Sequence, residues 1–245
     1  MRFLLYNVRY CVGTGRYFHF PFPGRGYLNA SARNLARITD FIKTSRPDIV
    51  GLVEVDSGSL RSGRKNQVES IASELGHYHV YESKYGEDSL VNWLPVARKQ
   101  GNAFLTSDVV EAQRFHYFEH GVKKLVIELE LSNLVLFLVH LSLKFRHRHH
   151  QMSELYELVK ETKKPHIVAG DFNAYWGDQE IQLFLEATRL QSANTGGMPS
   201  YPSKAPRRQL DFVLHSREIE ITHFEMPQVS YSDHLPLICD FEIRG

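Results

Sequence analysis

Short apolar runs alternate along the chain with helical patterns, and this alternation limits the folds that the chain can adopt. The helical patterns predict helices over residues 31–45, 66–75, 148–162 and 178–188. The apolar runs predict strands over residues 3–8, 48–55, 78–82, 101–106, 109–115, 122–131, 134–141, 166–170, 209–215, 219–225 and 236–243. With no linker or internal repeat between them, these elements favour one α/β (α+β) domain of packed sheets over residues 1–245.

The chain is long enough to bury a large core. A chain of 245 residues and 28.3 kDa should bury about 73% of its unfolded surface, without metal or disulfide staples. A hydrophobic share of 42% and a charged share of 23% exclude a disordered chain. Lys plus Arg number 29 and Asp plus Glu 28, which disfavours a polybasic protein that coats DNA.

Cysteine usage and hydropathy predict a soluble cytoplasmic protein. Cys11 and Cys239 are too few for a disulfide framework, and free thiols suit a reducing compartment. The apolar run at the N-terminus is too short for a signal peptide. No run approaches 18 apolar residues, so we expect no stable membrane insertion. Nothing in the pattern calls for an obligate protein partner.

Polar residues stand at the ends of several predicted strands. Those that follow or precede an apolar run, or lie within one, are Asn7, Glu54, His140, Asp171, Asn173, Asp211, Asp233 and His234. Carboxylates among apolar residues are costly unless they are paired or bind a metal, and catalytic groups often follow the strands of a rigid scaffold. Oxygen donors with two histidines and no cysteine cluster favour Mg²⁺ or Mn²⁺ over structural zinc.

These residues fall into ordered motifs that resemble a known family. The motifs are Tyr6-Asn7, Leu52-Val53-Glu54, Gly101-Asn102-Ala103, Val139-His140-Leu141, Gly170-Asp171-Phe172-Asn173, Leu210-Asp211-Phe212 and Ser232-Asp233-His234. In this order, and over almost the whole chain, they resemble the endonuclease/exonuclease/phosphatase superfamily, which includes DNase I, exonuclease III-type enzymes, sphingomyelinases and inositol-polyphosphate phosphatases. The resemblance implies a DNase I-like four-layer sandwich, with two mixed β-sheets face to face and helices outside.

The resemblance also implies metal-assisted hydrolysis of a phosphoester by in-line attack of water. Glu54 would be the main ligand of Mg²⁺ (or Mn²⁺), with Asn7 and Asp233 close to the ion. The ion would neutralise phosphate oxygens and the charge that develops on the leaving group.

The remaining motif residues have roles around the phosphate in the same resemblance. Asp171 would position or deprotonate the attacking water, and Asp211 would orient His234. Either Asp171 or His234 can be the base, and the sequence leaves this open. His140 would bind the phosphate or protonate the leaving oxygen. Residues expected beside the substrate phosphate are Asn173, Asn102 and Arg208.

Two positions depart from family patterns. The metal-binding glutamate is usually preceded by glutamine, and here Val53 stands in that place. The segment His140-Leu141-Ser142 resembles the DNase I, sphingomyelinase and inositol-phosphatase branches, whereas abasic-site endonucleases usually carry tyrosine there. This lowers the expectation of an abasic-site endonuclease.

Two segments outside the motifs have open interpretations. The aromatic segment 17–27 is either a surface loop, a lid over the substrate or a membrane-contacting loop. The run 144–150 is either a solvated loop and helix start or a basic rim that attracts a phosphorylated substrate.

The substrate class also stays open. A phosphodiester is favoured; the alternatives are a DNA or RNA endo- or exonuclease and a phosphatase of a lipid or small-molecule phosphoester. A catalytically inactive binding module is a remote alternative, because the acidic and histidine set is complete.

Overall fold

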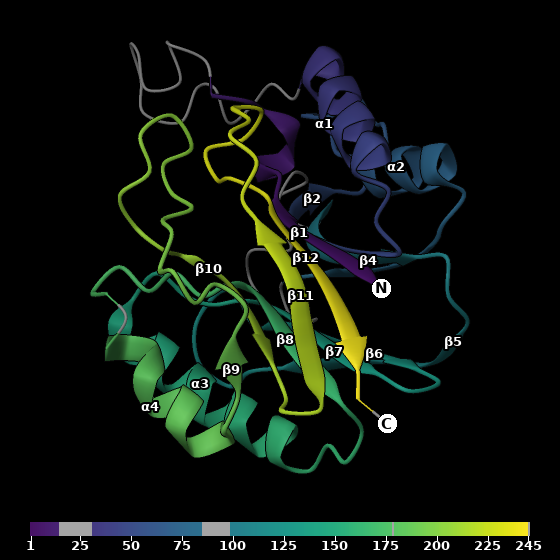
Figure 1. Cartoon of the computed structure of the whole chain (residues 1–245). Helices are drawn as coiled ribbons and strands as arrows, with labels where there is room; N and C mark the ends of the chain where they lie inside the picture. The colour runs from purple at the N-terminus through teal and green to yellow at the C-terminus, as the bar shows by residue number, and fades with distance from the viewer. Residues whose placement is uncertain (15–30, 85–98, 178, 245) are drawn as a thin grey trace.

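This computed structural model describes residues 1–14, 31–84, 99–177 and 179–244. Two six-stranded mixed sheets form its centre (Figure 1). The order of the first sheet is β11 (Ile219–Glu225), β12 (Leu237–Ile243), β1 (Arg2–Asn7), β2 (Ile49–Asp56), β4 (Gln100–Thr106) and β3 (Tyr78–Ser83). The order of the second is β5 (Val110–Tyr117), β6 (Leu125–Leu131), β7 (Val135–His140), β8 (His166–Asp171), β10 (Asp211–His215) and β9 (Gln191–Ser192). In each sheet one central pair is parallel, β1 with β2 and β7 with β8.

Helices cover the outer face of each sheet, which gives four layers (Figure 1). Helices α1 (Ala32–Ser45) and α2 (Gln67–Leu75) pack on the first sheet, and α3 (Phe145–Lys160) and α4 (Gln179–Thr188) pack on the second. A third apolar cluster, which includes Phe3, Phe104 and Leu138, lies between the two sheets. The predicted four-layer sandwich is therefore confirmed. None of the helices in the described ranges is long and apolar enough to cross a membrane.

Local signals explain where two of the helices begin. The Ser31 side chain accepts a hydrogen bond from the Asn34 amide at the start of α1, and Asn66 does the same for Val68 in α2. Gly76 ends α2 in the left-handed conformation that glycine adopts without strain.

The predicted bounds were wrong by one turn at α3. This helix begins at Phe145 instead of 148, and Lys144 at its N-cap makes no side-chain capping hydrogen bond. The usual signal for a helix start is therefore missing from the sequence. Strand β6 begins at Leu125 instead of 122, because Lys124 closes a loop by accepting a hydrogen bond from the Phe118 amide.

The strand directions bring the motif residues together at one end of the sandwich. In the second sheet, His140 lies beside Asp171 in the parallel pair, and Asp211 lies beside Asp171 in the antiparallel pair. In the first sheet, Asn7 ends β1 next to Val53 of the parallel strand β2. The ends of strands from both sheets thus supply the candidate site.

Candidate active site

Asp171 lies at the centre of the candidate site. Its Oδ1 accepts a hydrogen bond from the Asn173 amide at 2.9 Å, and its Oδ2 accepts one from Asn7 Nδ2 at 3.1 Å. Asn173 adopts a positive φ of 51°, a conformation in which asparagine is enriched. Its own Nδ2 donates to the Leu141 carbonyl at 2.9 Å. Asp171 and Asn173 are thereby fixed to each other and to the end of β7.

Gly170 explains why the motif begins with glycine. Its φ is +148°, and a Cβ at this position would lie 1.9 Å from the Val139 carbonyl oxygen. The absence of a side chain therefore lets β8 approach β7 closely just before Asp171.

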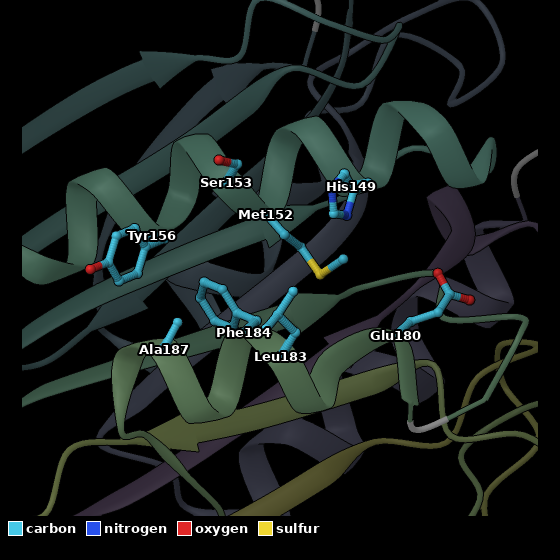
Figure 2. Close-up of a pocket in the computed structure, with 8 residues that line it drawn as sticks. All are labelled: His149, Met152, Ser153, Tyr156, Glu180, Leu183, Phe184 and Ala187. Atoms are coloured by element: carbon cyan, nitrogen blue, oxygen red, sulfur yellow. The ribbon is translucent and has the colours of Figure 1, made fainter.

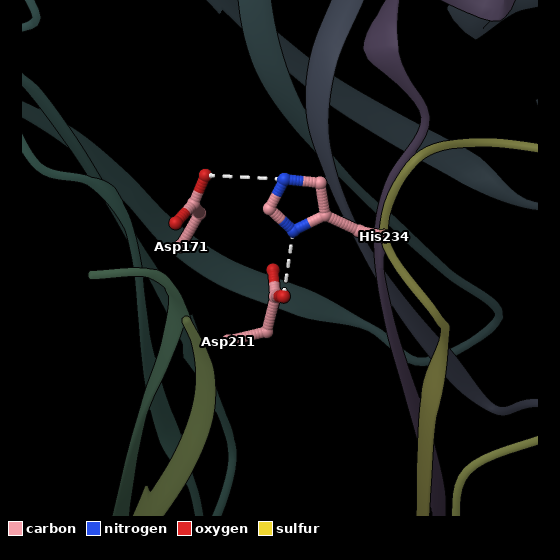
Figure 3. Close-up of side chains that lie close together, drawn as sticks. All are labelled: Asp171, Asp211 and His234. Carbon is pink, nitrogen blue, oxygen red and sulfur yellow. Dashed lines mark hydrogen bonds and ion pairs between the residues drawn. The ribbon is translucent and has the colours of Figure 1, made fainter. Parts of the chain in front are cut away.

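Asp211 and His234 form a buried pair beside Asp171 (Figure 3). The His234 Nδ1 and Asp211 Oδ2 atoms are 2.7 Å apart, and His234 Nε2 lies 4.0 Å from Asp171 Oδ2. Ser200, which is fully buried, donates to Asp211 Oδ2 at 2.6 Å. With its Nδ1 held by Asp211, the imidazole presents its Nε2 to Asp171.

His140 flanks Asp171 on strand β7, whereas Asp211 flanks it on strand β10. His140 Nε2 also lies near Glu54. Its Nε2 is 3.4 Å from Asp171 Oδ2 and 3.8 Å from Glu54 Oε1. The Lys123 ammonium makes a close contact with the same Nε2 atom. The pKa of His140 lies well below its usual value because the side chain is buried and because Lys123 is a nearby positive charge. His140 is thus neutral at pH 7.

Glu54 reaches the site through a bulge in β2. The register between β2 and β4 shifts between Leu52 and Val55, and Glu54 adopts a φ of +59°. Its amide donates to Asn102 Oδ1 at 3.3 Å. The Asn102 Nδ2 atom is buried and has no hydrogen-bond partner among the described residues. Because a buried donor without a partner is costly, Asn102 fits a role that a ligand completes.

Asp233 is the second carboxylate near Glu54. Its Oδ2 pairs with Arg9 Nη1 at 3.1 Å, and its side chain is 20% exposed. Burial raises the pKa of Asp233, and the negative charge of Glu54 adds to this effect. Two carboxylates that repel each other in a partly open position form a site suited to a cation.

The donor set fits Mg²⁺ or Mn²⁺. Glu54 and Asp233 offer carboxylate oxygens, and Asn7 offers an amide oxygen that already accepts from the Arg9 amide at 3.1 Å. Such hard oxygen donors suit these ions.

A second group of potential ligands suits a metal less well. Atoms of Asp171, Asp211 and His234 lie within 4.8 Å of one another. In this group, however, His234 Nδ1 is already bound to Asp211. Burial works to lower the pKa of His234, but Asp211 and Asp171 together raise it to about 10. A protonated imidazole is not a metal ligand.

Asp171 has the properties of a base near neutral pH. Burial raises its pKa, and the negative charge of Asp211 contributes, against the opposing effect of His234. His234, which Asp211 holds beside Asp171, is protonated over the same pH range. This distribution separates a carboxylate that can accept a proton from an imidazolium that can bind an anion.

The arginines and the basic run have mostly structural contacts. Arg208 donates to the Tyr175 carbonyl at the rim, two residues past Asn173. Arg148 is buried and pairs with Glu180, so the run 144–150 is neither wholly solvated nor wholly a rim. Arg61 forms a fully buried pair with Asp56 at 2.8 Å. The aromatic segment 17–27 lies outside the described residues.

A groove lies between α3 and α4, with His149 and Glu180 among the residues that line it (Figure 2). It has a volume of about 330 Å³, and apolar side chains of Met152, Leu183 and Phe184 line it with Tyr156. None of the predicted site residues lines it.

Sequence reasoning missed three residues of the site. Ser200 holds Asp211, Lys123 contacts His140, and the Arg9 guanidinium pairs with Asp233. Ser200 lies between the predicted helix 178–188 and the predicted strand 209–215, and Lys123 falls within the predicted strand 122–131. Only Arg9 carried a signal, since it stands two residues after the Tyr6-Asn7 motif.

Comparison with known proteins identifies the class to which this fold and site belong. The model of the Endonuclease/Exonuclease/phosphatase family matches residues 4–234, so the chain belongs to that family. Its members are generally metal-dependent phosphoesterases. The resemblance drawn from the motifs is thereby confirmed.

Solved structures of other proteins share the fold of this chain. The chain is similar to a functionally unknown conserved protein from Enterococcus faecalis V583, with a TM-score of 0.74, 16% identity and 100% coverage of both chains. The human Nocturnin catalytic domain with bound sulfate gives a TM-score of 0.70 at 21% identity, covering 99% of this chain and 93% of that one. A mannosyl-6-phosphatase from Bacteroides thetaiotaomicron VPI-5482 gives 0.71 at 14% identity, covering 99% and 100%.

Curated relatives match over a shorter stretch. UPF0294 protein VV2535 of Vibrio vulnificus (strain YJ016) is 34% identical over 97 residues, which are 38% of this chain and 33% of that protein. The match spans about one third of that relative's length.

Proposed function

We propose that this chain is a Mg²⁺- or Mn²⁺-dependent hydrolase that cleaves a phosphodiester by in-line attack of water. The observation that carries the proposal is the buried group of Asp171, Asp211 and His234 beside His140 and Glu54. Buried titratable groups with strongly shifted pKa values mark a functional site. Membership of a phosphoesterase family supports the same reaction class.

The cation would be held by Glu54 and Asp233, with Asn7 beside them. When bound, it supplies positive charge that neutralises phosphate oxygens during the displacement. Arg9 and Lys123 lie against the two carboxylates and limit their mutual repulsion before the ion binds.

Asp171 accepts the proton of the attacking water in this proposal. The Asn173 amide and Asn7 Nδ2 hold its two oxygens in place, and burial keeps its pKa high enough for proton transfer near neutral pH. His234, protonated and oriented by Asp211, donates to a phosphate oxygen. Asn102 donates its buried Nδ2 to the same phosphate group.

The proposal is tested with bis(4-nitrophenyl) phosphate and 4-nitrophenyl phosphate in the presence of Mg²⁺. Wild type should cleave the diester faster than the monoester, and EDTA or Asp171→Ala should abolish cleavage. Asp40→Ala, which removes an exposed carboxylate from α1, serves as the matched control and should keep wild-type activity. A wild-type protein that cleaves neither compound with Mg²⁺ or Mn²⁺ would reject the proposal.

A nuclease and a phosphoesterase of small or lipid-linked substrates differ in their dependence on salt. Labelled single- and double-stranded DNA is incubated with wild type and Asp171→Ala over a range of KCl concentrations. Nucleic-acid binding releases counterions, so DNA cleavage should weaken steeply with salt, whereas cleavage of a small diester should change little. If DNA stays intact while the small diester is hydrolysed, the result favours a phosphoesterase of small or lipid-linked substrates.

A further inference from the structure

The ammonium group of Lys123 lies among the groups predicted to handle phosphate. It contacts His140 Nε2 closely and lies 3.9 Å from Glu54 Oε1. Its side chain is only 17% exposed. An ammonium group can donate three hydrogen bonds, and Lys123 makes one within the described part of the chain. The largely buried Lys123 ammonium therefore faces the candidate site with N–H donors that no described residue accepts.

Three hydrogen bonds fix the loop that carries Lys123. The Phe118 amide donates to the Lys124 carbonyl at 2.9 Å, and the Lys124 amide donates to the Lys84 carbonyl at 3.1 Å. Gln151 of α3, which is fully buried, donates from Nε2 to the Lys123 carbonyl at 2.7 Å. The loop is thus tied to itself, to the end of β3 and to α3.

Gln151 also ties this loop to the segment that follows His140. Its Oε1 accepts from the Ser142 amide at 2.8 Å, and its Nε2 donates to the His120 carbonyl at 2.8 Å. Gly121 lies so close that a Cβ would be 2.3 Å from Ser142 Oγ, and its φ is +96°. One buried amide therefore sets the position of Lys123 relative to His140.

We propose that Lys123 is a further catalytic residue, whose ammonium donates to a non-bridging oxygen of the scissile phosphate beside His140 and Glu54. This inference rests on the proposed function. A fixed cation aimed at the position where charge develops stabilises the transition state without reorganisation. A role as counter-ion of Glu54 alone does not explain why the Lys123 ammonium lies against His140. The 3.9 Å between Lys123 Nζ and Glu54 Oε1 is too long for a hydrogen bond.

Three variants test the activity part of the proposal. Lys123→Met should lower kcat/KM for bis(4-nitrophenyl) phosphate by about 100-fold, as for loss of one transition-state donor. Lys123→Arg keeps the charge and should recover part of the loss. Lys124→Met, which removes the neighbouring charge, should stay within about threefold of wild type. Circular dichroism and thermal melts establish that each variant is folded. Equal activity of Lys123→Met and wild type would overturn the proposal.

Binding of inorganic phosphate gives a readout that does not depend on turnover. Isothermal titration calorimetry in EDTA should show phosphate binding to wild type and to Lys124→Met, and at least tenfold weaker binding to folded Lys123→Met. A separate Mg²⁺ titration addresses the counter-ion role. If Lys123→Met binds phosphate like wild type and only its Mg²⁺ affinity changes, Lys123 acts on Glu54 and the proposal is wrong. A third outcome is that wild type hydrolyses no phosphoester but binds phosphate through Lys123. This outcome rejects the proposed function and keeps the proposed contact between Lys123 and phosphate.

Discussion

Asp171 combines an expected catalytic role with a cost to stability. It is 2% exposed, and its pKa in the folded protein is raised by burial and by Asp211. A raised pKa means that the folded state binds the proton more tightly than the unfolded state. Ionised Asp171 therefore destabilises the fold once the pH exceeds the unfolded value, and the penalty is complete above the folded value.

The variant Asp171→Asn should separate these two properties. We expect activity to fall by at least about 1,000-fold, since the proton acceptor is lost. Stability at pH 8 should rise by about 1–2 kcal/mol, roughly 2–8 °C in Tm, with a smaller gain at pH 5. Thermal melts at both pH values measure the difference. A variant that is less stable than wild type at pH 8 would contradict the burial argument.

Asp211 controls the charge of His234 with the opposite effect on stability. The pKa of His234 is raised to about 10, in spite of burial, by Asp211 and Asp171. This stabilisation is fully present below the unfolded pKa of about 6.5 and is lost as the pH rises through about 10. Asp211→Asn should lower the pKa of His234. The same variant should lose activity by about 1,000-fold or more. NMR titration of the imidazole checks the pKa, and an unchanged value would refute the pairing.

At the scale of elements, one buried ion pair joins α3 to α4 and to the loop after His140. Arg148 Nε donates to Glu180 Oε2 at 2.9 Å, and Arg148 Nη1 donates to the Leu143 carbonyl at 2.6 Å. The two side chains are 1% and 4% exposed. Glu180 Oε1 also accepts from the Trp176 amide at 2.7 Å. The pair thereby fixes both segments that follow the site strands β7 and β8.

Removing one partner should cost far more than removing both. Arg148→Met leaves Glu180 buried without its cation, and we expect a loss of about 3–5 kcal/mol. The double variant Arg148→Met/Glu180→Met should recover a large part of this loss, because no charge remains buried. Urea unfolding of the single and double variants measures the coupling. Additive losses would show that the two side chains act independently.

The sequence predicted the strands better than the contacts between distant segments. Strand positions were predictable because apolar runs are local signals, and Val53 fits this picture since it packs in the core between the sheets. The motif residues were predictable from the family resemblance. Lys123 and Ser200 were not, because each acts through a contact that only the packed fold creates. The roles assigned to the site residues stay predictions.

At the scale of the whole molecule, the candidate cation site brings together two carboxylates that lie far apart in the sequence. Glu54 lies within the early strand β2, and Asp233 precedes the last strand, β12. Both carboxylates lie near the same point, where the charge of Glu54 contributes to the raised pKa of Asp233. An ion bound there would remove this repulsion in the folded state only, because the unfolded chain keeps the two groups apart.

Mg²⁺ should therefore stabilise the protein. At a free concentration 100 times the dissociation constant, binding to the folded state alone adds about 2.7 kcal/mol, which is roughly 5–11 °C in Tm for a chain of this size. Glu54→Gln removes the main ligand charge and should abolish most of this shift, whereas Asp40→Ala on the outer face of α1 should keep it. Differential scanning fluorimetry with Mg²⁺ or EDTA measures both. A shift that persists in Glu54→Gln would assign the ion elsewhere, with the Asp171, Asp211 and His234 group the next site to test.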